Sequence, residues 1–241
     1  FLVGWDSLHP EFDFKEAFSR VFNGVWREEQ GVRAIAAHSH MADLPTISFL
    51  WLAHFVFPVE SLRYLYIFAC LILGPLGVYF FLKYTFEKES NNLDAILASF
   101  LGSAFYLLNL VTLQHFFVPF EMFPTQFAFL PWLFLFSLKF LREGKKKNLL
   151  IFALLTILSS PMAYAATLFY AYLAALFLFL ISHWLLFSNR TLGFRRLFVL
   201  IFLILGLNSY WILPNVYSVI KQGPTIENAQ INRLFSPEAF L

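Results

Sequence analysis

Long apolar segments alternate with short polar ones along most of the 241 residues of the chain. A helix needs about 20 apolar residues to cross the hydrocarbon core of a bilayer, and several segments approach or reach that length. Those that could cross run from Leu62 to Lys83, Leu93 to Thr112, Glu121 to Leu141, Asn148 to Ser160, Tyr164 to Phe187 and Leu197 to Pro214. The pattern predicts an all-α polytopic membrane protein with six spans.

The apolar stretch from Asn148 to Phe187 has to cross the bilayer twice. It holds about 40 residues, which as one helix would be about 60 Å long, twice the thickness of the hydrocarbon core. Proline removes a helix donor and disfavours the α conformation in the residue before it. Ser159, Ser160 and Pro161 therefore mark the expected break.

The first 61 residues are expected to form an outer loop with two membrane-associated elements. From Phe14 to Trp26, apolar residues recur at spacings of three and four, which predicts an amphipathic helix in the membrane plane. Asp13 followed by Glu16 fits a capping box at its start. The apolar run from Leu44 to Phe57 holds about 14 residues, a length that favours a re-entrant or interfacial segment over a full span.

Basic residues predict which ends of the spans face the cytoplasm. They cluster at Lys83 and Lys88, from Lys139 to Lys147, and at Arg190, Arg195 and Arg196. The positive-inside rule places all three clusters in the cytoplasm. The opposite loops are then extracytoplasmic, together with the N-terminal region if Leu44 to Phe57 does not cross. If that run does cross, the N-terminal region is cytoplasmic.

Composition narrows the class of protein further. Aromatic residues make up 20% of the chain and charged residues only 13%. The bilayer is therefore the expected partner, and no nucleic-acid surface is indicated. Cys70 is the only cysteine, which rules out an intrachain disulfide and a cysteine-based metal site.

The chain is expected to be a fragment of a single membrane domain. Phe1 to Val3 resemble the last turn of a membrane helix that begins earlier, and the sequence stops at Leu241 in the middle of a segment. We divide the fragment into the first outer loop (1–61), the region of the six spans (62–220) and an outer segment that leads to a further C-terminal region (221–241).

The segment GWDSLHPEFDF, residues 4–14, is the first place to look for chemistry, because it holds three carboxylates and a histidine beside an apolar stub. Charges are costly at membrane depth, so such a cluster indicates a functional site. Asp6 follows the stub directly and could act as a general base with a raised pKa. A solvated carboxylate that only marks a helix end is an equal alternative. Glu11 could assist Asp6, hold a metal or be an exposed loop charge, whereas Asp13 is better explained as a helix cap.

The expected topology brings further polar residues to the outer face, where we assign them to substrate binding: His9, His38, His40, Asp43, His115, Glu121 and Tyr210. His38 and His40 could share one metal ion only on an extended or turned backbone, and loop histidines more often contact substrate or water. No metal ligand is therefore assigned. A divalent metal cofactor stays open.

Three stretches of the sequence resemble a known family in their order and spacing. They are GWDSLHPEFDFKEAFSRVFNGVW, SHMADLP and NSYWILPNVYSVIKQGPTIENA, beginning at Gly4, Ser39 and Asn208. They resemble the N-terminal membrane region of bacterial cell-wall arabinofuranosyltransferases, within the GT-C class of membrane glycosyltransferases.

The resemblance implies a GT-C-like helical bundle that transfers a sugar from a polyprenyl-phosphate donor to a cell-envelope glycan or lipid acceptor on the extracytoplasmic face. It implies that Asp6 is the general base, and that the amphipathic helix and the re-entrant run border the donor site. The residues after Asp6 differ from those of the arabinose-transferring members, so the sugar stays open.

Two other classes of protein compete with a transferase. A transporter or flippase should show two related halves with broken helices and polar groups at the membrane midplane. Here the charged residues collect near the ends of the spans instead. A scaffolding membrane protein would leave the acidic cluster without a chemical role.

Overall fold

The computed structural model describes residues 10–23, 26–27, 34–35, 40–86, 92–117, 120–187 and 190–227. The fold is all-α, as the sequence predicts, apart from one antiparallel pair of two-residue strands, β1 (Trp26–Arg27) and β2 (Ala34–Ile35). The 3-10 helices are η1 (Pro10–Phe12), η2 (His40–Asp43) and η3 (Ser160–Tyr164). The α-helices are α1 (Phe14–Phe22), α2 (Leu44–Ala53), α3 (Val59–Phe86), α4 (Asn92–Leu108), α5 (Leu110–Phe117), α6 (Met122–Glu143), α7 (Lys146–Leu158), α8 (Ala166–Phe187) and α9 (Arg190–Glu227).

Four of these helices, α3, α6, α8 and α9, are long and apolar enough to cross a bilayer, and the bent pair of α4 and α5 would make a fifth span. They indicate a multi-pass membrane protein. The expected span from Asn148 to Ser160 is α7, which holds 13 residues. At 1.5 Å per residue it is about 20 Å long, shorter than a hydrocarbon core of about 30 Å. The break before α8 lies where the sequence places it, because η3 begins at Ser160.

The apolar segment after Leu93 is bent by 45° between α4 and α5, where the sequence predicts one span. Asn109 lies at the bend, and its Nδ2 donates to the carbonyl oxygen of Tyr106 at 2.8 Å. Its Oδ1 accepts from the backbone N–H of Thr112 at 3.0 Å. Since Thr112 Oγ1 also donates to the Tyr106 carbonyl at 2.6 Å, side chains bind the backbone groups that the bend exposes.

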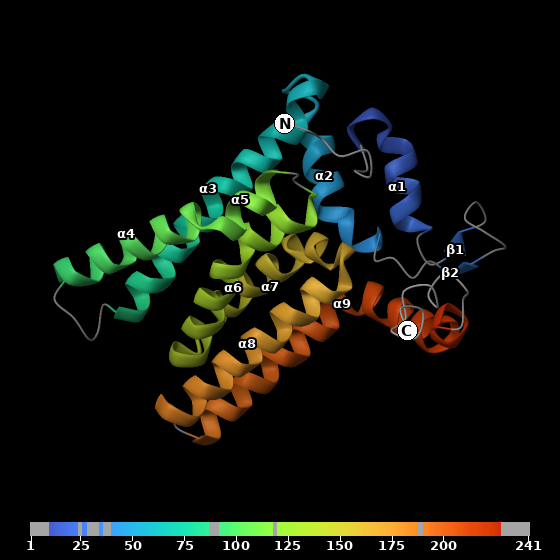
Figure 1. The fold of residues 1–241 in the computed structure, drawn as a ribbon. Coiled ribbons are helices and arrows are strands. Elements are labelled where there is room, and N and C mark those ends of the chain that lie inside the picture. The colour runs from blue at the N-terminus through green and yellow to red at the C-terminus, as the bar shows by residue number, and fades with distance from the viewer. Residues whose placement is uncertain are drawn as a thin grey trace, which may run out of the picture.

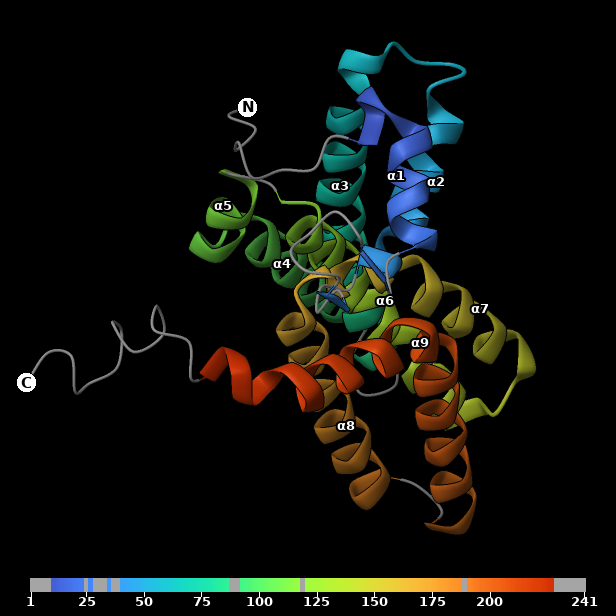
Figure 2. The ribbon, with the colours of Figure 1, turned by 90° about the vertical axis from the view of Figure 1, so that its right-hand side faces the viewer.

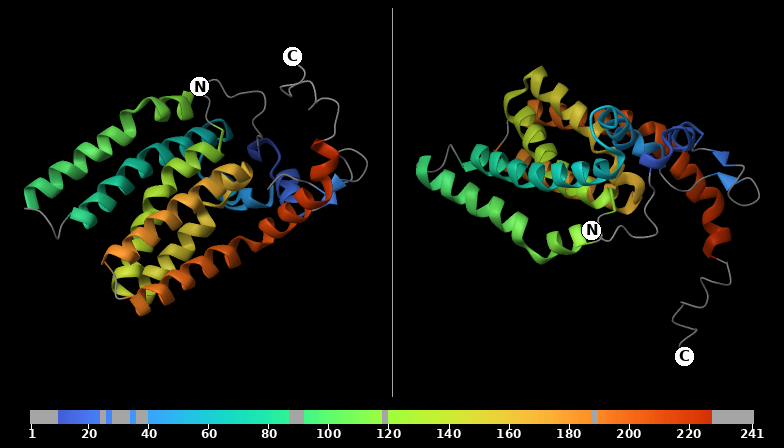
Figure 3. Two further views of the ribbon diagram at one scale, coloured as in Figure 1. Left: turned by 60° about the horizontal axis from the view of Figure 1, so that its bottom comes forward. Right: turned by 90° about the horizontal axis from the view of Figure 1, so that it is seen from above.

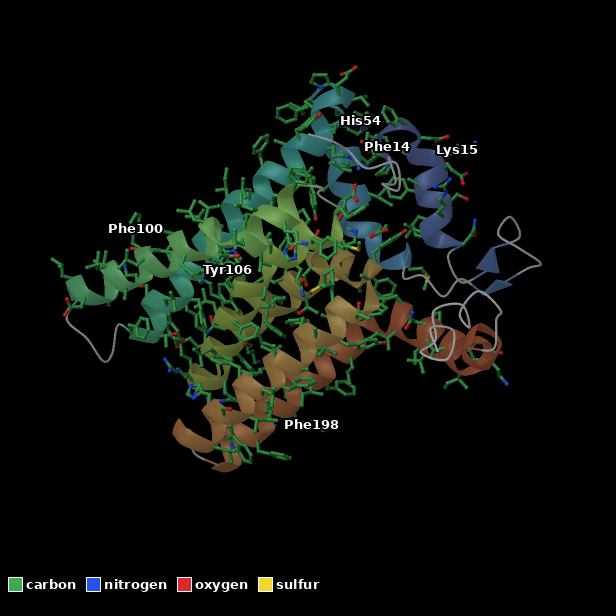
Figure 4. All side chains as sticks on the ribbon, viewed as in Figure 1. Phe14, Lys15, His54, Phe100, Tyr106 and Phe198 are labelled. Carbon is green, nitrogen blue, oxygen red and sulfur yellow. The ribbon has the colours of Figure 1, made fainter. Side chains whose placement is uncertain are left out.

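Helix α6 is at the centre of the bundle, packed against α3, α7, α8 and α9, while α4 packs on the far side of α3 (Figure 1). The main core lies among α6, α7, η3, α8 and α9, and its largest fully buried side chains include Phe152, Phe169, Tyr172 and Trp211. Outward-facing aromatic side chains such as Phe100 and Phe198 point away from the bundle (Figure 4), as expected of side chains that face lipid.

Helix α1 is amphipathic and capped as expected, but it ends at Phe22, and Trp26, which the sequence places on the same helix, lies in β1. Asp13 Oδ1 accepts from the backbone N–H of Glu16 at 3.0 Å. Its apolar face packs on protein, because Ala17 and Val21 are buried against Ile47 of α2, and the two helices lie side by side (Figure 2). The 10 residues of α2 span about 15 Å, half the hydrocarbon core. The re-entrant path of this segment stays a prediction.

The members of the basic clusters that the structure describes gather at one end of the bundle. Arg196 of α9 donates from Nη1 to the carbonyl oxygen of Leu141 at 2.8 Å. Arg142 donates from Nε to Nε2 of His183 at 2.8 Å, and Tyr84 donates to Glu143 at 3.1 Å. These contacts join the ends of α3, α6, α8 and the start of α9. Helices α1 and α2 lie at the opposite end, and α9 continues past α8 toward β1 and β2 (Figures 1 and 3).

Opposite sidedness of the two ends is directly testable by cysteine labelling. Cys70 is buried and is first replaced by alanine. Single cysteines are then placed, in separate variants, at Lys15 of α1 and at Lys146 of α7, which are both exposed. We expect a membrane-impermeant maleimide to label position 15 in intact cells and position 146 only after permeabilisation, because the positive-inside rule places Lys146 in the cytoplasm. A cysteine at exposed Arg195 should behave like position 146. Labelling of positions 15 and 146 from the same side would contradict the topology.

Candidate functional site

A group of polar side chains meets at the end of the bundle opposite the basic clusters. Six elements or their flanks contribute: Glu11 from η1, Asp43 from η2, Arg63 from α3, Glu121 just before α6, Ser160 from η3 and Tyr210 from α9. We call these six residues the outer cluster. The chain places them together because η2 packs on η3 and α9, while η1 packs on α3.

Arg63 binds two carboxylates in the outer cluster. Its Nε donates to Glu11 Oε1 at 3.0 Å and its Nη2 to Glu11 Oε2 at 3.3 Å, a two-pronged contact. Its Nη1 lies 2.8 Å from Oε1 of Glu121. The side chains of Arg63 and Glu11 are 6% and 5% exposed, so this ion pair is buried. The rigid fork of arginine suits such an arrangement, and lysine could not reproduce it.

Sequence reasoning missed Arg63. The residue lies one position inside the expected span that begins at Leu62. Ionisable residues within membrane segments are rare and indicate function by default. A charged residue at the start of an apolar run is the signal by which Arg63 could have been identified.

Asp43 ends η2 and precedes α2, but its side chain makes no capping hydrogen bond to that helix. Burial raises the pKa of the Asp43 carboxyl well above its usual range, and the negative charge of nearby Glu121 raises it further. The residue nevertheless keeps some accessible surface. Asp43 is thus surrounded by protein and still open to a ligand.

Tyr210 and Ser160 connect α9 and η3 to the segment that carries Asp43. Tyr210 donates from its hydroxyl to Ser160 Oγ at 3.2 Å. Ser160 Oγ donates in turn to the carbonyl oxygen of Ala42 at 2.8 Å. Because Ala42 directly precedes Asp43, these two hydrogen bonds bring the Tyr210 hydroxyl to the segment that carries Asp43.

A second polar chain fixes the helices beneath the outer cluster. Thr46 of α2 donates from Oγ1 to the hydroxyl oxygen of Tyr66 on α3 at 3.3 Å. The Tyr66 hydroxyl shares a hydrogen bond of 2.5 Å with Thr125 Oγ1 on α6. Thr125 Oγ1 also contacts the carbonyl oxygen of Glu121 at 2.5 Å. The hydroxyl groups thereby set the positions of α2, α3 and α6 relative to one another.

The structure brings four of the expected site residues together: Glu11, Asp43, Glu121 and Tyr210. His115 lies on α5 with its ring stacked on Phe123 at 5.0 Å. Asp6, His9 and His38 lie outside the described residues, and His40 begins η2 with a side chain that is not described.

Metal coordination has no candidate group among the side chains that the structure describes, where no three His, Cys, Asp or Glu residues gather in a suitable arrangement. Within the outer cluster, Glu11 and Glu121 instead contact the Arg63 guanidinium.

Comparisons of the chain with protein-family models, with curated proteins and with solved structures found no match.

Proposed function

We propose that the protein is a membrane glycosyltransferase that moves a sugar from a polyprenyl-phosphate donor to a cell-envelope glycan or lipid acceptor on the extracytoplasmic face. The observation that carries this proposal is the convergence of three carboxylates, an arginine and a tyrosine at one end of a bundle of apolar helices. A lipid-linked donor keeps its chain in the bilayer and its sugar at the interface. Its enzyme therefore needs a polar site at the end of apolar helices.

The proposed reaction is a displacement at the anomeric carbon of the donor sugar. The acceptor hydroxyl oxygen forms the new bond, the bond from the anomeric carbon to the phosphate oxygen breaks, and polyprenyl phosphate leaves with the electron pair. Asp6 takes the proton of the acceptor hydroxyl as the general base. The resemblance to the GT-C class supports this assignment.

Glu11 has a positioning role in this proposal. Its carboxylate is held by the Arg63 fork, which fixes η1 against α3. His9, His38, His40, Asp43, His115, Glu121 and Tyr210 remain candidates for substrate binding.

Aromatic side chains of α4 to α6 suit the isoprenoid tail of the donor. Phe127 stacks on Tyr106 at 4.4 Å and meets Phe116 edge-on at 5.1 Å, so these rings support one another. Phe105 and Phe117 are 75% and 72% exposed and present their rings outward. Lipid chains in general would be accommodated there as well.

The decisive experiment replaces Asp6 by asparagine in the full-length protein. A positioned general base contributes about 10²- to 10⁴-fold to a rate. We expect a loss of that size in transfer from radiolabelled polyprenyl-phosphate sugars, with unchanged expression and thermal stability. The matched control is Asp94→Asn, because Asp94 is exposed at the start of α4, near the opposite end.

Two outcomes would contradict the proposal. Full activity of the Asp6→Asn variant would contradict the assignment of Asp6 as the general base. Absence of transfer by the wild-type protein across a panel of polyprenyl-phosphate sugars would contradict the proposed transferase function. Movement of those lipids between leaflets would favour a flippase instead.

A further inference from the structure

Positive charge accumulates at the end of the bundle opposite the outer cluster, where α6 turns into α7 and where α9 begins. Residues 139–147 hold five cations and one carboxylate, and residues 190–196 hold three cations and no carboxylate. The one carboxylate, Glu143, is paired with Lys145, whose Nζ lies 2.9 Å from Glu143 Oε2. The remaining cations therefore have no counter-charge within either segment.

Arg196 holds these two segments together. Its Nη1 donates to the carbonyl oxygens of Leu141 at 2.8 Å and Arg142 at 3.0 Å, at the end of α6. Gly144 ends that helix with a φ of 69°, and a Cβ atom on it would overlap the Arg196 guanidinium. The start of α9 is thereby fixed beside the turn between α6 and α7 (Figure 3).

Three cations beside this contact are available to a ligand. Lys146 and Lys147 begin α7, Arg195 directly precedes Arg196 on α9, and all three side chains are exposed. None of them forms an ion pair with any residue that the structure describes. We call Lys146, Lys147 and Arg195 the junction cations.

Exposed apolar side chains continue from the junction cations along both helices. On α7, Lys146 is followed at spacings of four by the exposed residues Leu150 and Leu154, which lie on the same helix face. On α9, Arg195 is followed at spacings of three and four by exposed Phe198 and Phe202. Helix α7 packs against α9. Two neighbouring helices thus each present a face that begins with a cation and continues as apolar surface.

We propose that the junction cations bind the headgroup phosphate of an anionic phospholipid, whose acyl chains lie along these faces of α7 and α9. Basic sites at the ends of membrane helices recognise anionic headgroups. The apolar continuation selects a lipid over a phosphate compound in solution, which would gain nothing from the exposed leucine and phenylalanine side chains. This inference does not depend on the proposed transferase activity.

Lipid titration of the purified protein in a neutral detergent tests the site. The concentration dependence of thermal unfolding gives the Kd for phosphatidylglycerol, because a ligand of the folded state raises its stability. The variant combines Lys146→Gln, Lys147→Gln and Arg195→Gln. Each cation near an anionic membrane surface contributes about fivefold in affinity, so we expect the Kd to rise about a hundredfold. Unfolding without lipid should not change, since the three side chains are exposed.

The matched control combines Lys15→Gln, Arg20→Gln and Lys221→Gln, which remove the same number of charges from exposed positions near the other end of the bundle. This variant should keep the wild-type Kd. Phosphatidylcholine with the same acyl chains carries no net charge and should bind far more weakly than phosphatidylglycerol. Glycerol 3-phosphate, which has the phosphate without the chains, should not stabilise the protein at the concentrations at which the lipid does.

Three outcomes would overturn the inference. Equal stabilisation by phosphatidylglycerol and phosphatidylcholine would show that the cations do not recognise the headgroup. Equal stabilisation by glycerol 3-phosphate would indicate a site for a soluble phosphate compound. An equal rise in Kd for the control variant would show that the net charge of the protein acts, rather than the junction cations.

Discussion

Replacement of Arg63 by methionine is expected to destabilise the protein by about 3–5 kcal/mol, the usual effect of removing one partner of a buried ion pair. Methionine keeps most of the apolar stem but leaves the carboxylate of Glu11 buried, with a side chain that is 5% exposed in the native structure. Glu121 loses the same cation, which lies 2.8 Å away. Unfolding of the purified protein in detergent, followed against temperature or denaturant, measures the loss.

The matched control is Arg20→Met, which removes an ion pair of nearly the same length at the surface. Arg20 Nε lies 3.1 Å from Glu16 Oε1, but the two side chains are 46% and 44% exposed. Exposed pairs one helical turn apart contribute only about 0.3–0.5 kcal/mol. Similar losses for the two variants would show that burial does not govern the Arg63 contact.

A triple variant separates the charge from the packing. Adding Glu11→Gln and Glu121→Gln to Arg63→Met removes the carboxylates that would otherwise lie buried without their cation. We expect this variant to regain part of the lost stability, because neutral partners of similar shape avoid most of the desolvation penalty.

Alanine at Gly74 is expected to destabilise the protein by about 1–3 kcal/mol, the usual effect of overpacking a close contact. A Cβ atom at this position would lie 2.4 Å from Cε1 of Phe127 and 3.0 Å from its carbonyl oxygen. Small residues let helix backbones approach closely in membranes. Either the Phe127 ring or the α3 to α6 spacing must shift to make room.

The control is Gly206→Ala, which makes the same chemical change on α9. A Cβ atom there has no neighbour within 4 Å, so the variant should be as stable as wild type or slightly more stable, because alanine favours a helix over glycine. Thermal unfolding of both variants under identical detergent conditions measures their stabilities relative to wild type. A Gly74→Ala variant as stable as Gly206→Ala would contradict close packing of α3 on α6.

The features that the sequence predicts well are those that depend on neighbouring residues in the chain. Long apolar runs became helices, Asp13 caps α1, and the break at Ser159 to Pro161 separates α7 from α8. Periodicity, capping and proline chemistry act over a few residues, so one sequence suffices to recognise them.

The features that it misses depend on specific contacts that hydrophobic periodicity does not report, some of them local and some between segments far apart in the chain. The bend at Asn109 requires the hydroxyl of Thr112 and a carbonyl from the preceding turn to meet. Similarly, η3 packs against η2, which lies more than 110 residues earlier in the chain. Apolar length alone cannot reveal either contact.

The candidate site likewise combines residues that the sequence predicts with a contact that it does not. Residue type and topology brought Glu11, Asp43, Glu121 and Tyr210 to one face, but the cation that joins two of them lies inside an apolar run and was overlooked. Its partner Glu11 is 52 positions away. Contact over that distance cannot be inferred from spacing.

The Arg63 contact also sets an order for the assembly of the protein during synthesis. Glu11 is made first, yet the guanidinium that holds it follows 52 residues later, and the second carboxylate comes only just before α6. The contact between Glu11 and Arg63 therefore cannot form before α1, α2 and the start of α3 have been made, and the contact with Glu121 cannot form before α4 and α5 have followed. Surface that stays exposed during folding is prone to aggregation, so we expect the interval between translation of η1 and α6 to be the vulnerable period in the biogenesis of this fold.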